Sequence, residues 1–273
     1  MVDTFTKDSL TAALAEISER GYIQSHRDTS KRRNDGAAGN LLEQLLGIEE
    51  NNLPLPNANE WELKVQRSTS NSLVTLFHKE PSPRAIKFVH RVLLPLYGWP
   101  HQQAGSKHPS DEMSFRQTIP GPRVTDRGFY VNCDNNRVEV HFDSSEVSPR
   151  HAEWLATVAA RVGLGDLDPV PYWGFQDLEA LIASKLTNVV YVTADVKRKD
   201  KQEYFHYKKA EMLSGFSMDN FLEKLALGEV LVEFDARTRH NHGTKFRTRQ
   251  QTIHDLYAHD VVLFDHPPAQ NIP

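Results

Sequence analysis

Residues 56–64 of this chain read PNANEWELK, and VQR follows at 65–67. Within this stretch Glu62 and Lys64 are two positions apart. On a β-strand, residues i and i+2 point to the same face, so a strand here would place the ammonium beside the carboxylate. A carboxylate binds a hard cation such as Mg²⁺, and a nearby lysine orients a water or stabilises charge on a phosphate. The pair alone is weak evidence, because E-x-K also occurs on ordinary surface strands.

The segments around this strand predict a mixed α/β chain, with one mixed central β-sheet flanked by helices. Leucines and isoleucine at helical spacing, ended by Gly21, predict a helix over residues 8–20, and a second helix over 38–46 carries Glu43 among leucines. Period-two alternation predicts a strand over 71–79, next to the one at 61–67. Further strands are predicted at FYVNC and RVEVHFD, joined by a hairpin, at NVVYVTADV (188–196) and at VLVEFDAR (230–237).

Composition limits the class of protein. The chain has 273 residues, of which 39% are hydrophobic and 25% charged, a composition typical of a globular protein rather than a disordered one. It contains no uncharged apolar run of about 18 residues, as a membrane span needs, and no export signal at its start. We therefore expect a cytoplasmic protein with no membrane partner. The single cysteine, Cys133, excludes an internal disulfide framework and a multi-cysteine zinc site.

A second polar motif lies near the C-terminal end. HNHGTKFR occupies residues 240–247 and follows Asp235 and Arg237. Arginine, histidine and asparagine in a glycine-containing loop between strands suit hydrogen bonding to base edges, arginine to guanine and asparagine to adenine. The letters HNH do not indicate an HNH nuclease, whose signature residues are spread over tens of positions. A zinc site is also disfavoured, because His240 and His242 lack a well-spaced third ligand.

Several segments, taken in order, resemble one family. They are GNLLEQLLGIEENNLPLPNANEWELK (39–64), KLTNVVYV (185–192), EYFHYKKAEML (203–213), FLEKLALGEVLVEFDAR (221–237) and HGTKFR (242–247). This pattern is similar to the MvaI/BcnI-type restriction endonucleases, relatives of MutH in the PD-(D/E)XK nuclease superfamily. The resemblance implies a PD-(D/E)XK core with DNA in a cleft. It also implies a single unit over 1–273, with a catalytic lobe near 1–95, a DNA-recognition lobe near 165–265, and a middle region, 97–165, without an assigned role.

The resemblance also implies roles for individual residues. Glu62 would be a metal-binding carboxylate, Lys64 the lysine that orients the water, and Glu43 the helical glutamate that supports the metal and water shell. Mg²⁺ would be the cofactor, with Mn²⁺ as a substitute, and double-stranded DNA the partner. The implied DNA-binding residues are Asp235, Arg237, His240, Asn241, His242, Lys245 and Arg247, with Asp235 as an acceptor for cytosine. Lys185 is a weaker candidate for contact with a backbone phosphate.

One position departs from the family pattern. Asn57 stands where the family has a metal-binding aspartate, five residues before Glu62. An asparagine carbonyl still coordinates Mg²⁺ but brings no charge, so the affinity for the metal should fall. Three explanations remain open at this point. Asn57 belongs to a natural variant that works with asparagine, helped by Glu60; it is an engineered, inactivating change; or the chain binds DNA and no longer cuts it.

The function expected from these observations is a Mg²⁺-dependent, sequence-specific endonuclease of the restriction type. The resemblance implies a monomer that cuts one strand at a time, and a cognate DNA methyltransferase as its partner in restriction–modification. Two alternatives remain. One is a DNA-binding protein without catalysis, motivated by Asn57, and the other is a MutH-like nicking enzyme that depends on a partner protein.

Overall fold

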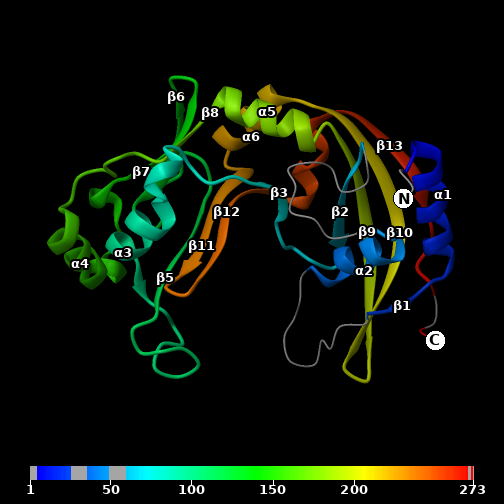
Figure 1. The fold of residues 1–273 in the computed structure, drawn as a ribbon, viewed down its shortest axis with the longest axis horizontal. Helices are drawn as coiled ribbons and strands as arrows, with labels where there is room; N and C mark the ends of the chain where they lie inside the picture. Colours follow the sequence, from blue (N-terminus) through cyan, green and yellow to red (C-terminus); the bar gives the residue numbers. More distant parts are fainter. Residues whose placement is uncertain (1–4, 26–35, 49–59, 270–271, 273) are drawn as a thin grey trace. The chain divides into compact units, whose positions relative to one another are not determined.

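The computed structural model of the chain describes residues 5–25, 36–48, 60–269 and 272 (Figure 1). The chain forms two compact units. Unit 1 comprises Met1–Val74, Ala180–Met218 and Ile253–Pro273, and unit 2 comprises Thr75–Glu179 and Asp219–Thr252. The catalytic and recognition lobes expected from the sequence stay a prediction. No helix in the described part of the chain is both long and apolar enough to cross a lipid bilayer.

Unit 1 is built on one mixed sheet. Its order is β1 (Ile23–Gln24), β10 (Gln202–Phe216), β9 (Asn188–Lys199) and β2 (Glu62–Arg67), and β13 (Tyr257–Asp265) also pairs with β10. β2 runs parallel to β9, whereas β9, β1 and β13 run antiparallel to β10. In register across the sheet, Lys64 lies beside Tyr191, and Tyr191 lies beside Glu211.

Helices cover one face of this sheet. α1 (Lys7–Glu19) begins at a capping box between Thr6 and Ser9, and α2 (Ala37–Leu45) follows it in the chain. Their buried side chains form one core with alternate residues of the strands, including Leu10, Leu14, Ile17, Leu41, Leu42, Leu63, Val190, Val192, Phe205, Tyr207 and Met212. Because successive strand residues point to opposite faces, Glu62, Lys64, Tyr191 and Glu211 lie on the face turned away from this core.

Unit 2 contains two sheets. The larger one has the order β3 (Val74–His78), β12 (His240–Thr248), β11 (Val230–Arg237), β5 (Met113–Ile119) and β4 (Trp99–Pro100). The smaller one has the order β6 (Phe129–Asp134), β7 (Arg137–Phe142) and β8 (Tyr172–Gly174). The remaining α-helices are α3 (Leu94–Tyr97), α4 (Ala152–Val162), α5 (Phe175–Lys185), which runs from unit 2 into unit 1, and α6 (Met218–Ala226).

Aromatic side chains hold the two sheets of unit 2 together. Trp173 of β8 lies 5.1 Å from Phe246 and 6.4 Å from Phe234, measured between ring centroids. Phe115 of β5 contacts both Phe129 and Phe234. These rings lie on one face of β5, β11 and β12, so the polar residues that alternate with them occupy the other face.

The fold class expected from the sequence is confirmed as mixed α/β of the restriction-endonuclease type. Three local expectations were wrong. β3 pairs with β12 of the larger sheet in unit 2 and not with β2, and the described strands form three sheets rather than one. Residues 240–248 form the strand β12, not a loop, because Thr244, Phe246 and Thr248 alternate inward with Lys245 and Arg247 outward. The DNA cleft implied by the resemblance stays a prediction.

Candidate functional site

Glu62 and Lys64 are brought together by β2. The Nζ of Lys64 donates a hydrogen bond of 2.7 Å to Oε1 of Glu62, and both side chains are largely buried. The Nζ of Lys185, the last residue of α5, lies 3.6 Å from the same oxygen. One carboxylate oxygen therefore faces two ammonium groups, an arrangement that the spacing of Glu62 and Lys64 alone did not predict.

The second oxygen of Glu62 has a different environment. Oε2 is buried and has no hydrogen-bond partner among the described residues, and the same holds for the hydroxyl of Tyr257. Burial and the negative charge of Glu62 raise the pKa of Tyr257, so this hydroxyl stays protonated at neutral pH. A buried carboxylate oxygen without a donor is costly unless a ligand occupies it. Glu62 therefore fits a cation or a polar ligand bound at Oε2.

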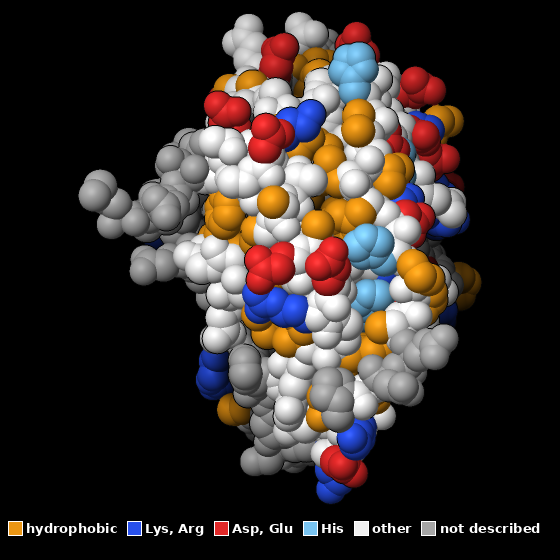
Figure 2. Space-filling model, turned by 90° about the vertical axis from the view of Figure 1, so that its right-hand side faces the viewer, with side chains coloured by type: hydrophobic (Ala, Val, Ile, Leu, Met, Phe, Trp, Pro, Cys, Tyr) orange, Lys and Arg blue, Asp and Glu red, His pale blue; other side chains and the backbone are white. Residues whose placement is uncertain are grey.

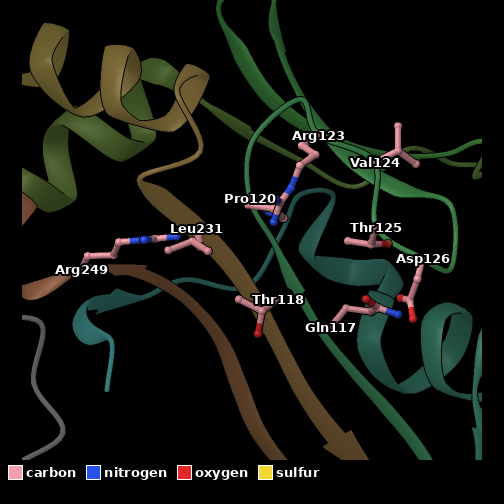
Figure 3. A pocket seen from close by; sticks show the side chains of 9 residues that line it. All are labelled: Gln117, Thr118, Pro120, Arg123, Val124, Thr125, Asp126, Leu231 and Arg249. Carbon is pink, nitrogen blue, oxygen red and sulfur yellow. The ribbon is translucent and has the colours of Figure 1, made fainter. Parts of the chain in front are cut away.

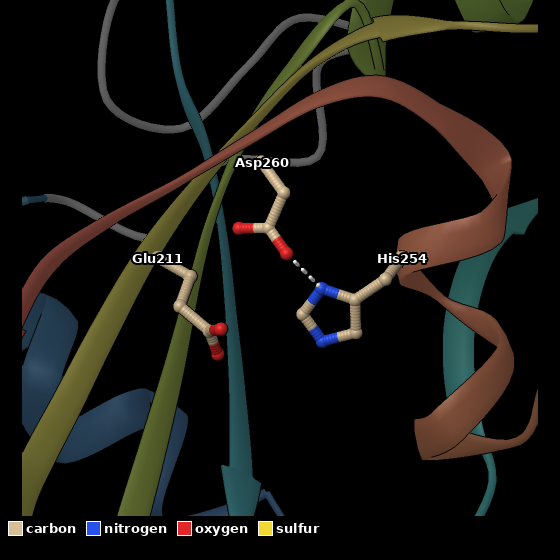
Figure 4. Close-up of side chains that lie close together, drawn as sticks. All are labelled: Glu211, His254 and Asp260. Atoms are coloured by element: carbon tan, nitrogen blue, oxygen red, sulfur yellow. Dashed lines mark hydrogen bonds and ion pairs between the residues drawn. The ribbon is translucent and has the colours of Figure 1, made fainter.

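A row of polar residues continues across the same face of the unit 1 sheet. The ring of Tyr191 contacts that of His254, in the short helix η6 (His254–Leu256), at 5.8 Å between centroids. The Nδ1 atom of His254 is hydrogen-bonded to Oδ2 of Asp260 at 2.7 Å (Figure 4). Ligand atoms of Glu211, His254 and Asp260 all lie within 4.8 Å of one another, so these three residues could hold a divalent cation.

This cluster also has a cation of its own. The Nζ of Lys209 lies 2.6 Å from Oε1 of Glu211. The pairing raises the pKa of Lys209, through the hydrogen bond to Glu211 first and then through nearby carboxylates, so the lysine is charged. A metal ion would have to compete with this ammonium for Glu211. At Glu62 both lysines contact Oε1, and Oε2 has no hydrogen-bond partner among the described residues.

The roles of all the predicted site residues stay predictions, including those of Glu43 and Asn57. Glu43 lies on α2, the helix that packs on β2, and its side chain is half-buried. Its supporting role stays a prediction. Asn57 lies outside the described residues.

On unit 1, the side that carries α1 and β13 shows acidic, basic and apolar side chains interspersed with one another (Figure 2). A surface that binds nucleic acid by charge gathers lysines and arginines on one face. The described side chains visible on this side do not form such a face, so they do not mark it as a phosphate-binding surface.

Most of the charged residues predicted to read DNA lie on the polar face of the larger sheet in unit 2. Asn241 instead lies across from the buried Ala236, which belongs to the other face. Glu233, Asp235 and Arg237 alternate along β11, and Lys245 and Arg247 alternate along β12. Lys245 lies directly across from Glu233 in the register of the two strands. Arg116 of β5 lies across from Asp235 on the other side. Three neighbouring strands thus contribute charged side chains to one surface.

Most cations on this face are already engaged with carboxylates. Arg247 donates a hydrogen bond of 2.7 Å to Oε2 of the buried Glu233, and Lys245 donates to its Oε1 at 3.2 Å. Asp235 takes weaker ion pairs from Arg116 at 3.5 Å and from Lys245 at 3.8 Å. Burial would raise the pKa of Glu233, but the hydrogen bond and charge of Arg247 and the charge of Lys245 lower it. Glu233 is therefore ionised and holds both cations in place.

Glu112 likewise holds two cationic side chains, at the end of the β11–β12 hairpin. Its side chain is fully buried and accepts hydrogen bonds from Arg237 at 2.9 Å and from Arg239 at 2.7 Å, one at each oxygen. Burial would raise the pKa of Glu112, but the hydrogen bonds from the two arginines outweigh it and lower the pKa to about 2. The guanidinium groups are thereby fixed relative to β11 and β12.

The histidines and the asparagine of the motif lie on the more exposed part of β12. The rings of His240 and His242 meet edge to face at 4.2 Å between centroids. Asn241 accepts a hydrogen bond from the backbone N–H of Gly243 at 2.9 Å, and its Nδ2 lies 3.4 Å from Nε2 of His90. Burial lowers the pKa of His242, so this ring stays neutral at physiological pH. A neutral histidine offers one donor and one acceptor to a partner.

A comparison of the whole sequence with models of protein families identifies the family of this chain. A sequence model of the MvaI/BcnI restriction endonuclease family matches residues 11–257. The chain belongs to this family. A member of the MvaI/BcnI family is an endodeoxyribonuclease of the restriction type. The matched range includes the E-x-K pair on β2 and the polar face of the β11–β12 hairpin, called the polar hairpin face below.

Two solved structures are similar to this member of the MvaI/BcnI family. One, described as the restriction endonuclease MvaI in complex with a cognate DNA substrate, has 20% sequence identity and a TM-score of 0.74, and the match covers 95% of this chain and 99% of that one. The other, MvaI in the absence of DNA, has 21% identity and a TM-score of 0.50 and covers 96% and 99%. At these identities the likeness shows a shared fold. No curated protein sequence matches the chain.

Sequence reasoning missed several residues of this MvaI/BcnI family member that the structure places beside the predicted ones. Arg116, Glu112 and Glu233 each contact a predicted DNA-reading residue, and Arg239 shares Glu112 with Arg237. Glu233 could have been found, because it precedes Asp235 and Arg237 at the same period-two spacing. Glu112 and Arg116 could not, since only the pairing of β5 with β11 brings them there.

Unit 2 of this MvaI/BcnI family member also contains an open hollow of about 420 Å³. It lies beside β5 and β11, and the guanidinium groups of Arg123 and Arg249 point toward its middle (Figure 3). Asp126 at its rim is ion-paired with Arg150 and hydrogen-bonded to His151, so its charge is already balanced. The lining is completed by Gln117, Thr118, Pro120, Val124, Thr125 and Leu231.

Proposed function

We propose that this chain is a sequence-specific endonuclease that hydrolyses phosphodiester bonds of double-stranded DNA with the help of a divalent cation. Membership of the MvaI/BcnI family supports the class of reaction. The observation that carries the proposal is the buried pair of Glu62 and Lys64 on β2, because phosphodiester hydrolysis needs a cation ligand and a lysine side by side. The similar structure of MvaI with cognate DNA supports double-stranded DNA as the partner.

In this proposal Glu62 holds Mg²⁺, or Mn²⁺ in its place, and Asn57 contributes a neutral carbonyl ligand. The bound cation would lower the pKa of a coordinated water and offset negative charge on the phosphate. Lys64 is held by Glu62 at 2.7 Å, so its ammonium is oriented before any substrate arrives. The lysine then positions the attacking water in line with the scissile phosphate and stabilises negative charge as it develops.

Sequence recognition is assigned to the polar hairpin face of unit 2. Arg237 and Arg247 are oriented by the buried carboxylates Glu112 and Glu233, which favours defined contacts with base edges in the major groove. His240, Asn241, His242 and Lys245 extend the same strand with further donors and acceptors. Asp235 is the candidate acceptor for a cytosine amino group.

We further propose that the enzyme acts as a monomer and nicks the two strands in turn. Each chain has one E-x-K segment of this kind, so a single chain has one site with which to cut. A cognate DNA methyltransferase would protect the host sequence. A nicked-plasmid intermediate that accumulates and then disappears is the expected kinetic signature, whereas simultaneous double-strand cleavage by a stable dimer would contradict it.

The proposed function is tested by incubating plasmid and phage DNA with the protein in Mg²⁺ and in Mn²⁺. Discrete fragments that are lost in Lys64→Ala are expected. The second candidate is a DNA-binding protein without catalysis, which Asn57 favours. Binding that survives chelation, with no cleavage in either metal by the natural chain or by Asn57→Asp, would support this second candidate and overturn the first.

A further inference from the structure

The hollow of unit 2 adjoins the polar hairpin face. Leu231, which lines the hollow, lies across from Arg247 in the register of β11 and β12. Thr118, which also lines it, lies across from Glu233 in the register of β5 and β11. Arg249 lies two positions after Arg247 along the chain. The hollow therefore begins where the residues predicted to read bases end.

Two arginines bring unbalanced positive charge to this hollow. The guanidinium groups of Arg123 and Arg249 point toward its middle (Figure 3). In the part of the chain that the structure describes, neither guanidinium has a hydrogen bond or an ion pair. Arg237 and Arg247, on the adjoining face, are each paired with a buried glutamate. Neighbouring cations repel each other unless an anion offsets their charge, so the hollow fits an anionic ligand.

Asp126, the one carboxylate among the lining residues, does not cancel this charge. It is ion-paired with Arg150, and its Oδ2 lies 2.8 Å from Nε2 of His151. Burial would raise the pKa of Asp126, but the hydrogen bonds from His151 and Arg150 lower it. The carboxylate is therefore ionised, and its charge is offset by these partners. The charges of Arg123 and Arg249 remain in excess.

The backbone that presents the two arginines is fixed. Gly121, two residues before Arg123, has a φ of 60°, and a Cβ at this position would lie 2.2 Å from the carbonyl oxygen of Leu225. The chain can approach α6 this closely only with glycine. The carbonyl oxygen of Arg249 accepts a hydrogen bond of 3.1 Å from the N–H of Thr252. Both side chains thus extend from backbone that is held before any ligand binds.

The lining favours a phosphate group over a nucleobase. No aromatic side chain is among the residues that line the hollow, so a base turned out of a duplex would find no ring on which to stack. Arginine guanidinium groups match the geometry of phosphate oxygens, and the hydroxyl groups of Thr118 and Thr125 add possible donors. The hollow is open, so a continuous sugar–phosphate backbone can pass through it.

We propose that Arg123 and Arg249 together hold the sugar–phosphate backbone of duplex DNA, next to the base pair that Arg247 contacts. This inference rests on the proposed function, because it takes the polar hairpin face to lie against DNA. Phosphate contacts fix the position of a protein on a duplex, whereas base contacts carry the sequence information. Arg123 and Arg249 therefore supply affinity and register, and the arginines held by glutamates supply discrimination.

Arg137 supplies a matched control. It is an exposed arginine of the same unit, and its guanidinium lies 4.3 Å from the ring centroid of Tyr172. Its strand, β7, belongs to the smaller sheet, which packs on the aromatic face of the larger one. Arg137→Met removes one positive charge, as Arg123→Met and Arg249→Met do, but outside the lining of the hollow. Circular dichroism and thermal unfolding establish that the variants fold.

The first measurement is the binding of a short DNA duplex in the presence of a chelator, at several salt concentrations. Arg123→Met and Arg249→Met should each reduce the slope of log affinity against log salt by about one, and the double variant by about two. Arg123→Lys and Arg249→Lys keep the charge and should keep the slope. An unchanged slope in the Met variants, or the same reduction in Arg137→Met, would overturn the proposal.

The second measurement maps the contact on the DNA. The natural chain selects a duplex from a random pool in chelator, and the phosphates of this duplex are then ethylated singly. Ethylation at the phosphates held in the hollow should weaken binding by the natural chain but not by the double variant of Arg123 and Arg249. Ethylation elsewhere should affect both proteins alike. Identical interference patterns in the two proteins would contradict a backbone contact at the hollow.

Two further outcomes separate the possible sources of phosphate and the two proposals. If inorganic phosphate raises the Tm of the natural chain but not of the double variant, and the DNA slope is unchanged, the hollow binds a free anion and the proposal fails. If the natural chain neither selects a sequence nor cleaves DNA, but the slopes fall as expected, the proposed function fails while the backbone contact stands.

Discussion

The guanidinium of Arg247 donates a hydrogen bond of 2.7 Å to Oε2 of Glu233, a carboxylate buried in the polar face of the unit 2 sheet. The arginine expected to read a base is thus held in place by the protein itself. Such a side chain loses less conformational freedom on binding than a free arginine would. Defined orientation also allows a bidentate contact to one base rather than a general attraction to phosphates.

Arg247→Ala should therefore weaken discrimination at one base pair by about 1–3 kcal/mol, the value of one bidentate base contact. The measurement compares the affinity for the recognition sequence with that for sequences changed at each position. Arg116→Ala, which removes an exposed arginine from the same face, is the control. A uniform loss of affinity for all sequences would make Arg247 a phosphate contact instead.

Lys64→Ala should reduce cleavage by about 10²- to 10⁴-fold, the usual contribution of one positioned proton-transfer or charge-stabilising side chain. DNA binding should be largely retained, because recognition is assigned to the hairpin of unit 2. Single-turnover cleavage and a binding assay in chelator separate the two effects. Turnover at the natural rate would remove Lys64 from the mechanism.

Asn57→Asp should lower the Mg²⁺ concentration needed for half-maximal cleavage by about tenfold, since the charge of the ligands tunes cation affinity. The measurement is a titration of cleavage rate against Mg²⁺. Asn59→Asp places the same charge two residues further along and serves as the control. An identical response in both variants would show that added negative charge in the segment acts without a specific ligand at position 57.

Glu112 predicts a pH dependence of stability. Its folded-state pKa is about 2, below the ordinary value of 4.5, because the hydrogen bonds of Arg237 and Arg239 outweigh burial. The carboxylate therefore contributes stability that is fully present above about pH 4.5 and is lost as the pH falls toward 2. Denaturant unfolding over this range should show a smaller decline in Glu112→Gln. The exposed Glu146→Gln is the control, and parallel curves for Glu112→Gln and the natural chain would contradict the assignment.

Arg67 and Glu203 form a buried pair in unit 1. NH1 and NH2 of the arginine each donate a hydrogen bond of 2.9 Å, one to each oxygen of the glutamate. Arg67→Met should destabilise the protein by about 3–5 kcal/mol, because it leaves a buried carboxylate with less compensation. Arg20→Met, which breaks the exposed pair with Glu16, should cost about 1 kcal/mol or less. Equal losses in chemical denaturation would show that burial does not decide the effect.

Local patterns predicted much of this fold. The strands β2 and β11 and the helix α1 follow from period-two or helical spacing, and the hairpin of β6 and β7 turns at Asn135 and Asn136, both with positive φ. Pairing was harder. The order of strands is decided by contacts between distant residues, so the pairing of β3 with β12 was not visible in the sequence.

The candidate site was predictable to the same extent. The spacing of Glu62 and Lys64 gave their proximity, since it depends only on the strand between them. Lys185 reaches Glu62 only because α5 leads into β9, which lies parallel to β2. Arg237 is held by Glu112, which only the tertiary structure brings near it. Arg247 is held by Glu233, whose place on β11 was predictable but whose burial was not.

The long strand β10 pairs with β9 along one edge and with both β1 and β13 along the other. β1 pairs with residues 204–205 and β13 with residues 209–216, so segments from opposite parts of the sequence close one row of backbone hydrogen-bonding groups. An open strand of this length is a template for intermolecular pairing. A protein shortened before residue 257 should therefore aggregate through β10, which makes the integrity of β13 a condition for keeping the enzyme in solution.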